Sequence, residues 1–212
     1  LIVNSDFVSC STQAYVHQYD LLKGLKKGGT FLLNTVWEVA ELDEKLPASL
    51  KKYIADNDIN FYIINATKIA EDIGLGRRTN MIMQSAFFKL ADIIPIEDAI
   101  AYSKAGILKS YGNKGQKIVD MNNAAVDQGI DALVKVDVPA AWKDLKVETT
   151  TEENVPEFIT KMLRPINRLA GDDIPVSTFT GVEDGTFMSG SSAYEKRGIA
   201  VNVPKWIPEN CI

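Results

Sequence analysis

The segment Lys68–Leu90, KIAEDIGLGRRTNMIMQSAFFKL, separates two regions of the sequence that have different hydrophobic patterns. Before it, apolar runs of strand length alternate with helical patterns, and after Asn80 the pattern is helical only. Within the segment a helix is predicted to end at Gly74, and a short loop then carries Arg77 and Arg78 to the start of a second, strongly apolar helix. Glycine permits tight turns, guanidinium groups bind anions and the first amides of a helix are unsatisfied, so this loop is a candidate anion site. The alternative is that Gly74 only caps a helix and both arginines are solvated.

Upstream of this segment, the sequence predicts a first strand–helix–strand unit. Leu1–Ser9, LIVNSDFVS, has the pattern of a buried strand. Ala14–Leu25 has the pattern of an amphipathic helix, which is expected to stop at Gly28 and Gly29. Thr30–Thr35, TFLLNT, is a continuous apolar run, which is typical of a strand that is covered on both faces.

A second unit of the same kind follows. Glu44–Asp56 is predicted to be a helix, with Pro47 near its start where proline is tolerated. Ile59–Ala66, INFYIINA, is rich in β-branched and aromatic residues and predicts another buried strand. Lys68–Ile73 is predicted to be a short helix. This alternation predicts an α/β fold in which a mostly parallel sheet carries helices on both faces.

Three helices are predicted downstream of the arginine loop. Asn80–Ile94 is nearly all apolar and is expected to be deeply buried, and Pro95 ends it. Ile96–Tyr111 has acidic residues in its first turn, where the helix dipole favours them. After a GNKG turn, Gln116–Val136 has apolar residues at approximately helical spacing. These helices are expected to complete the domain.

The pattern weakens after Val138, and we predict a domain boundary near Thr149. A short helix is expected over Val155–Leu169, interrupted by Pro165. Beyond Gly171 the chain is rich in turn residues and has no periodicity that predicts a packed domain. The C-terminal part is therefore expected to be an irregular extension.

Composition restricts the partners that the chain can have. The 212 residues are 46% hydrophobic and 24% charged, which predicts a globular, soluble protein. The formal net charge is −5 and no basic run exceeds an adjacent pair, so neither a nucleic acid nor a membrane surface is an expected partner. No apolar run is as long as a membrane span, and the first residues do not resemble a signal peptide. We therefore expect a cytoplasmic protein.

The ends of the chain carry two further expectations. Cys10 and Cys211, the only cysteines, lie near opposite ends, which argues against a disulfide framework and favours a reducing compartment. The chain begins inside an apolar run without an initiator methionine, and it stops one residue after Cys211. We interpret it as a piece of a longer polypeptide.

Polar residues at strand ends provide a second set of candidates. Asn34 and Thr35 follow one predicted strand, and Asn65 stands in the same relation to the next. Ligands of open α/β sheets bind beyond the carboxyl ends of the strands, so these residues could line a crevice together with Arg78 and Asn80. Equally, strand-end polar residues can simply cap the following helix.

No complete catalytic constellation is visible in the sequence. Cys10 and His17 could form a nucleophile–base pair, but no third group is evident that would orient the base. His17 is the only histidine, and no metal-ligand spacing accompanies it. Adjacent acids at Glu152–Glu153 and Asp172–Asp173 lie in turn-rich sequence, where such pairs are usually solvated. Gly74-Leu75-Gly76 follows a helix, whereas a dinucleotide-binding fingerprint follows a strand. No catalytic residue is predicted.

The C-terminal residues 195–212, EKRGIAVNVPKWIPENCI, carry a family resemblance. They resemble the entry to the two-cluster ferredoxin domain of pyruvate:ferredoxin (flavodoxin) oxidoreductases, in which the cysteine matching Cys211 opens a C-x₂-C-x₂-C-x₃-C-P series. The body of the chain resembles the gamma-type domain of the same enzymes, so the resemblance covers essentially the whole chain. The segments that carry it are YDLLKGLKKGGTFLLNT (19–35), KIAEDIGLGRRTNMIMQSAFFKLADIIP (68–95), SYGNKGQKIVDMN (110–122) and AVDQGIDAL (125–133).

The resemblance implies a domain division and a ligand. Residues 1–149 would be a three-layer, Rossmann-like gamma-type domain, residues 150–190 a connector, and residues 191–212 the start of a ferredoxin-type domain. The domain contributes to coenzyme A binding in the family. The cofactor-binding candidates are therefore Arg78 as a phosphate partner, Asn80 as a hydrogen-bonding group, and Gly76, with Asn34 and Thr35 at the strand end. Arg77 is expected to face solvent.

The resemblance also implies the activity of the complete enzyme. It would decarboxylate pyruvate oxidatively to acetyl-CoA, with thiamine diphosphate, Mg²⁺ and 4Fe-4S clusters bound mostly outside this chain. Ferredoxin or flavodoxin would accept the electrons, and the enzyme would be a homodimer of anaerobic metabolism. Cys211 would ligate a 4Fe-4S cluster only in the complete enzyme.

One feature of the family is missing from this sequence. The gamma-type domain has a glycine-rich loop like GADGTVGANK after its first strand, and no such stretch is present here. The coenzyme A site is therefore expected to be partial, and the chain alone is not expected to be catalytic. The alternative function is that of an inter-domain scaffold with no ligand contact of its own.

Overall fold

The computed structural model describes residues 4–147, 154–195 and 204–211, which divide into two compact units. The sheet unit comprises Leu1–Val16 and Asp20–Glu148, and the C-terminal unit comprises His17–Tyr19 and Thr149–Ile212. The part of the chain that the structure describes has no helix long and apolar enough to cross a membrane.

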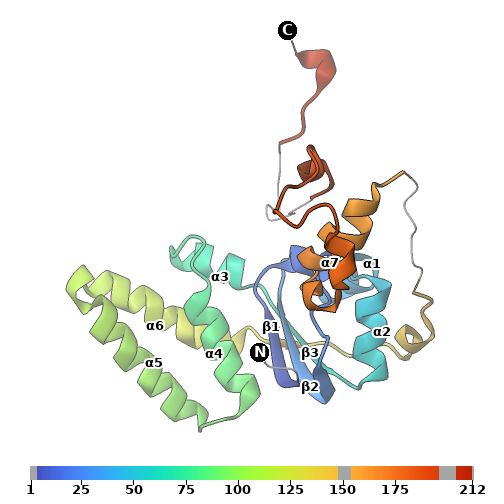
Figure 1. The fold of residues 1–212 in the computed structure, drawn as a ribbon. Helices are drawn as coiled ribbons and strands as arrows, with labels where there is room; N and C mark the ends of the chain where they lie inside the picture. The colour runs from blue at the N-terminus through green and yellow to red at the C-terminus, as the bar shows by residue number, and fades with distance from the viewer. Residues whose placement is uncertain (1–3, 148–153, 196–203, 212) are drawn as a thin grey trace. The chain divides into compact units, whose positions relative to one another are not determined.

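The sheet unit is built on four strands in the order β1-β2-β3-β4 (Figure 1). β1 (Ser5–Cys10), β2 (Leu25–Asn34) and β3 (Asn60–Ile64) are parallel, and β4 (Val134–Lys135) pairs antiparallel with β3. The predicted mostly parallel sheet is confirmed.

Both faces of the sheet are buried. In β2, Phe31 and Leu33 join one apolar cluster and Leu32 joins the other, and all three side chains are completely buried. Because successive side chains of a strand point to opposite faces, a strand covered on both sides needs a continuous apolar run. The TFLLNT run meets that need, and the Phe31 ring stacks on Phe61 with the ring centroids 5.3 Å apart.

Helices cover the two faces unequally. On one face lie α1 (Leu42–Lys45) and α2 (Ala48–Asp56). On the other lie α3 (Ala66–Ile73), α4 (Asn80–Ala91) and α6 (Gln116–Asp131). The result is the predicted three-layer α/β arrangement.

The predicted helix Ala14–Leu25 is wrong. A short 3-10 helix, Gln13–His17, is followed by turns, and Leu25 already belongs to β2. Leu22 and Leu25 are buried in the cluster below the sheet, so the apolar spacing that imitated a helix comes from a packed turn and a strand start. Gly28 and Gly29 lie inside β2, where the register jumps from Ser5↔Leu25 to Phe7↔Thr30.

The helix predicted over Gln116–Val136 is correct only to Asp131. Val134 and Lys135 form β4, which pairs with Ile63 and Tyr62 of β3, and the Val136 N–H donates to the Phe61 carbonyl at 2.9 Å. The free edge of β3 offers these residues backbone partners, and that option is visible only in three dimensions.

The helices that follow the arginine loop also differ in part from the prediction. α5 (Ile96–Tyr111) has the predicted bounds, whereas α4 ends at Ala91. The expected deep burial of Asn80–Ile94 is only partly correct, because Phe87 and Phe88 are half-buried within α4 and Ile93 is 65% exposed beyond its end. α4 and α6 approach each other closely. A Cβ built on Gly129 of α6 would lie only 2.5 Å from the Ile82 carbonyl oxygen of α4. α5 packs outside them and extends away from the strands (Figure 1).

The C-terminal unit is irregular, as predicted. A π-helical turn, Ile159–Leu163, runs into α7 (Arg164–Asn167), and 3-10 helices follow at Gly171–Asp173, Val176–Phe179, Ser191–Tyr194 and Pro208–Asn210. Pro165 lacks a backbone N–H, and the helical geometry changes from π to α beside it. The predicted start of a ferredoxin-type domain, residues 191–212, is described only in part, and its residues 196–203 and 212 lie outside the described residues. So do Glu152–Glu153.

Candidate functional site

The loop between α3 and α4 is anchored at Leu75 and exposed at Gly76. Gly74 caps α3 in the left-handed conformation, with φ +91°, and the Leu75 N–H donates to the Ala70 carbonyl at 2.7 Å. Leu75 is only 4% exposed and belongs to the cluster beneath α3 and α4. Gly76, with φ +62°, then turns the chain outward, and nothing lies within 4 Å of a Cβ built there. Sequence reasoning missed the anchoring role of Leu75, although an apolar residue between two glycines was a signal for it.

Both arginines of the loop, Arg77 and Arg78, are exposed. Neither the Arg77 nor the Arg78 side chain makes an ion pair or hydrogen bond with the described residues. The backbone of Arg78 is held by a weak N–H contact to the Leu75 carbonyl at 3.4 Å. Two guanidinium groups on a loop that is fixed from below can therefore meet an incoming anion.

The start of α4 adds partial positive charge to this loop. Asn80 is the first residue of α4, as predicted, and it is exposed. Thr79 occupies the N-cap without a side-chain cap hydrogen bond, and the first turn contains no acidic residue. The first amides of a twelve-residue helix thus remain available, and the helix dipole favours negative charge there.

Asn34 and Thr35 are buried, and both side chains already have partners. Asn34 Nδ2 donates to the Ser11 carbonyl at 3.0 Å, and its Oδ1 accepts the Ala66 N–H at 2.9 Å. Thr35 Oγ1 donates to Gln13 Oε1 at 2.9 Å. Together they tie the carboxyl ends of β1, β2 and β3 into one edge.

Capping, the alternative for the strand-end residues, is what the structure shows at two positions. Asn34 Oδ1 receives the first amide of α3, and Asn65 Oδ1 accepts the Lys68 N–H at 3.0 Å. Direct ligand contacts by Asn34 and Thr35 stay a prediction.

Cys10 behaves as a buried residue that closes β1. It is 3% exposed, and Sγ donates to the Thr12 carbonyl oxygen at 3.1 Å. Burial raises the pKa of this thiol above its ordinary value of 9.0, and backbone hydrogen bonding with Thr12 lowers it by less than burial raises it. The protonated thiol is a poor nucleophile at neutral pH.

Among the described residues, no group of three or more His, Cys, Asp or Glu side chains could hold a metal ion. Cys211 is exposed and is not disulfide-bonded. Its role as an iron–sulfur ligand stays a prediction.

The fold and the loop define an α/β domain with an exposed cationic turn at the edge of its helical layer. A family model described as pyruvate ferredoxin/flavodoxin oxidoreductase matches residues 1–132, which is more than half of the chain. The chain belongs to this family. A second family model, described as a domain of unknown function, matches residues 144–200.

The sequences of two curated relatives match this chain over its whole length. A pyruvate-flavodoxin oxidoreductase of Enterobacter agglomerans is 62% identical over 211 residues, and a pyruvate:ferredoxin oxidoreductase of Moorella thermoacetica is 54% identical over 215 residues. Each match covers 100% of this chain and 18% of the relative, so the chain spans about a fifth of the length of these curated relatives.

A solved structure supports the fold. Pyruvate oxidoreductase subunit PORC of Thermotoga maritima superimposes with a TM-score of 0.51 over 64% of this chain and 67% of that chain, at 20% sequence identity. At this identity the likeness concerns the fold alone. The resemblance inferred from the sequence is confirmed.

Proposed function

We propose that this chain contributes to coenzyme A binding within a longer pyruvate:ferredoxin or pyruvate:flavodoxin oxidoreductase. Such an enzyme decarboxylates pyruvate oxidatively and forms acetyl-CoA. Family membership and the names of the relatives support the reaction class. The observation that supports this ligand is the pair of exposed guanidinium groups, which have no ion pair with a described residue, beside the start of α4, whose N-cap has no side-chain hydrogen bond.

In this proposal Arg78 binds a phosphate of coenzyme A through charge-assisted hydrogen bonds. Asn80 donates or accepts a further hydrogen bond, and Gly76 lets the ligand approach the backbone because its Cβ position is open. Asn34 and Thr35 hold the sheet edge rigid through the hydrogen bonds described above. The chain positions the coenzyme, and none of its residues makes or breaks a bond of the substrate.

The remaining components belong to the longer polypeptide. Thiamine diphosphate with Mg²⁺ and most ligands of the 4Fe-4S clusters would lie in other domains, and Cys211 would supply one cluster ligand. Electrons would leave to ferredoxin or flavodoxin, and the complete enzyme would be a cytoplasmic homodimer. The length of the relatives supports partnership with other domains of the same polypeptide.

The test compares two adjacent arginines in the complete oxidoreductase. Arg78→Ala is expected to raise the apparent KM for coenzyme A about tenfold, equivalent to about 1.4 kcal/mol, with little change in the KM for pyruvate. Arg77→Ala is the matched control, since it removes the same charge from the same loop, and its effect is expected to be under about twofold. Equal effects of the two variants would show a general charge effect in place of a phosphate contact.

An inter-domain scaffold is the second candidate function. It is favoured by large apolar side chains that remain exposed in the C-terminal unit, including Leu169 at 85%, Val176 at 87% and Trp206 at 72%. If Arg78→Ala leaves the coenzyme A dependence unchanged and substitutions such as Val176→Ser prevent assembly of the complete enzyme, the scaffold replaces the ligand-binding proposal.

A further inference from the structure

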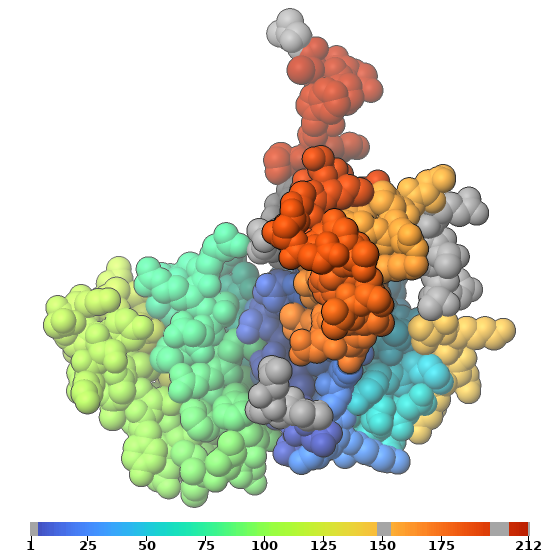
Figure 2. Space-filling model, in the orientation of Figure 1, coloured from blue at the N-terminus to red at the C-terminus, as the bar shows by residue number. Residues whose placement is uncertain are grey.

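One line of exposed residues runs along the outer side of α5. Asp98, Tyr102, Ala105 and Lys109 are spaced by four, three and four positions, which places them on one stripe of a helix. All four are exposed, and the large Tyr102 side chain is 69% exposed. In Figure 2 the yellow-green atoms of α5 form an outer border of the sheet unit.

The charges at the two ends of this stripe have no partners within the described chain. Neither Asp98 nor Lys109 makes an ion pair with a described residue, whereas Lys104 of the same helix pairs with Asp127 of α6 at 2.7 Å. The α5 charge that faces α6, Lys104, is therefore matched, whereas the two charges of the outer stripe have no ion pair with a described residue.

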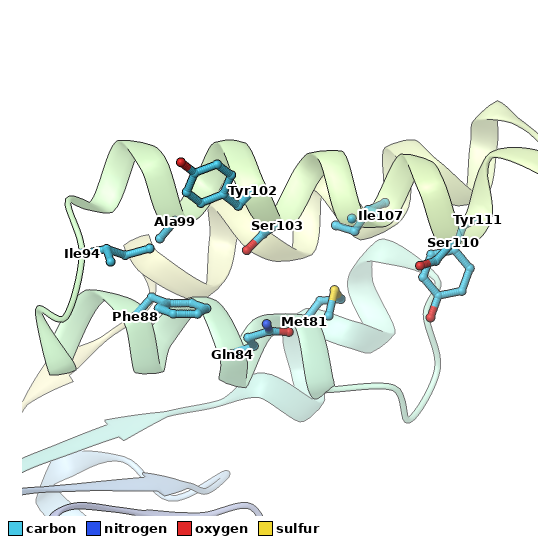
Figure 3. A pocket seen from close by; sticks show the side chains of 11 residues that line it. Met81, Gln84, Phe88, Ile94, Ala99, Tyr102, Ser103, Ile107, Ser110 and Tyr111 are labelled. Carbon is cyan, nitrogen blue, oxygen red and sulfur yellow. The ribbon is translucent and has the colours of Figure 1, made fainter.

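A groove lies beside the stripe, between α4 and α5 (Figure 3). Its volume is about 360 Å³. Tyr102 borders it, and the small residues Ser103 and Gly106 line its α5 side. A Cβ built on Gly106 would meet nothing within 4 Å, so this part of the helix surface is hollow.

The stripe is self-complementary under a two-fold rotation. Asp98 and Lys109 lie equally far from the midpoint of the stripe, between Ser103 and Lys104, and so do Tyr102 and Ala105. At 1.5 Å per residue the two charges are about 16 Å apart along the axis. In an antiparallel pair of α5 helices, each acid would face a base, and each tyrosine would face an alanine next to the hollow at Gly106.

We propose that the outer stripe of α5 is a contact surface for a second copy of this chain, paired antiparallel across a two-fold axis. Asp98 pairs with Lys109 of the partner subunit, and the Tyr102 ring enters the groove beside Gly106 of the partner subunit. An isologous contact requires one patch that complements itself, and this stripe has that property in its charges and in the spacing of Tyr102 and Ala105. The proposal shares with the proposed function only the expectation that copies of the polypeptide pair, and its test needs no coenzyme.

Ring burial and charge are expected to contribute unequally. Exposed ion pairs add little affinity, but like charges that face each other oppose association, so the charges define the antiparallel direction. The buried aromatic ring supplies most of the affinity.

The experiment measures self-association of the 212-residue chain by sedimentation equilibrium over a range of concentrations. Tyr102→Ser is expected to weaken the dimer at least tenfold. Asp98→Lys and Lys109→Asp are each expected to weaken it several-fold, and the two combined are expected to restore association to within about twofold of the original. Circular dichroism of each variant tests whether the fold is intact. We expect it to be, because the substituted side chains are exposed.

A cross-link locates the contact. In a Cys211→Ser background, Ala105→Cys is expected to give a covalent dimer with a short bis-maleimide, and Ser49→Cys, at an exposed position on α2, is the control and is expected not to. A chain that stays monomeric at millimolar concentration would overturn the proposal. So would association that the charge and tyrosine variants leave unchanged, or an α5 surface that is occupied by another domain when the longer polypeptide is assembled.

Discussion

The sheet unit and the C-terminal unit use apolar residues in different ways. In the sheet unit, Phe31, Leu32 and Leu33 are consecutive and completely buried. In the described part of the C-terminal unit, Ile159 and Met162 are buried, whereas Phe187 is 61% exposed and Val176 is 87% exposed. Periodic sequence allows residues to share a core, and aperiodic sequence leaves each apolar side chain to find local contacts. The stability of the chain should therefore reside in the sheet unit.

The largest expected effect comes from truncating one phenylalanine in each unit. Phe61→Ala removes a completely buried ring that stacks on Phe31, and it should lower the free energy of unfolding by about 3–5 kcal/mol. Phe187→Ala removes a ring whose contact is Phe158, with the centroids 5.7 Å apart, and it should cost less than about 1 kcal/mol. Urea unfolding followed by circular dichroism measures both. Similar losses would mean that the two units unfold as one cooperative core.

An intermediate effect is expected inside the helical layer, where two helical glycines differ in their surroundings. Gly129→Ala places a Cβ against the Ile82 carbonyl and should destabilise the chain by about 1–3 kcal/mol. Gly106→Ala places its Cβ in open space on an exposed helix, so it should stabilise the chain by about 0.5–1 kcal/mol. Thermal unfolding at low protein concentration compares them. A destabilising Gly106→Ala would contradict the open groove.

The smallest effect concerns the Ala140–Asp144 turn near the end of the sheet unit. Asp43 Oδ1 accepts hydrogen bonds from Lys51 Nζ at 3.0 Å and from Trp142 Nε1 at 2.8 Å, which attaches the Ala140–Asp144 turn to α1 and α2. The bond from Lys51, with that from Trp142, holds the pKa of Asp43 below its ordinary value of 3.8. A carboxyl group whose pKa is lower in the folded state stabilises the fold above its unfolded pKa. This contribution is lost as the pH falls through the folded pKa.

Stability measured from pH 6 downward should show this loss. Between about pH 5 and pH 2, the wild-type chain should lose more stability than the Asp43→Asn variant does. Asp92→Asn removes an exposed carboxyl group that has no ion pair among the described residues, and it is the control. Parallel curves for all three proteins would show that Asp43 does not hold the turn through its charge.

Much of the candidate site was predictable from residue order, because its parts are adjacent in the chain. Gly74, Arg78 and Asn80 lie within seven residues, and a helix end, a loop and a helix start can be recognised locally. The roles of Asn34 and Thr35 could not be decided in this way. Their partners, Ser11, Ala66 and Gln13, are more than twenty positions away, and only the folded chain shows that these side chains already have hydrogen-bond partners.

The sequence by itself determined the α/β class, the two-sided burial of β2 and β3, the position of α5 and the irregular C-terminal extension. Each of these follows from local hydrophobic periodicity and turn chemistry, which act over a few residues. Only the tertiary structure decided that the apolar residues near Leu22 form a turn, that Val134–Lys135 pair with the edge of β3, and that the outer stripe of α5 lies beside a groove. Those outcomes depend on which distant backbone groups and side chains come within contact distance, and no local pattern specifies that.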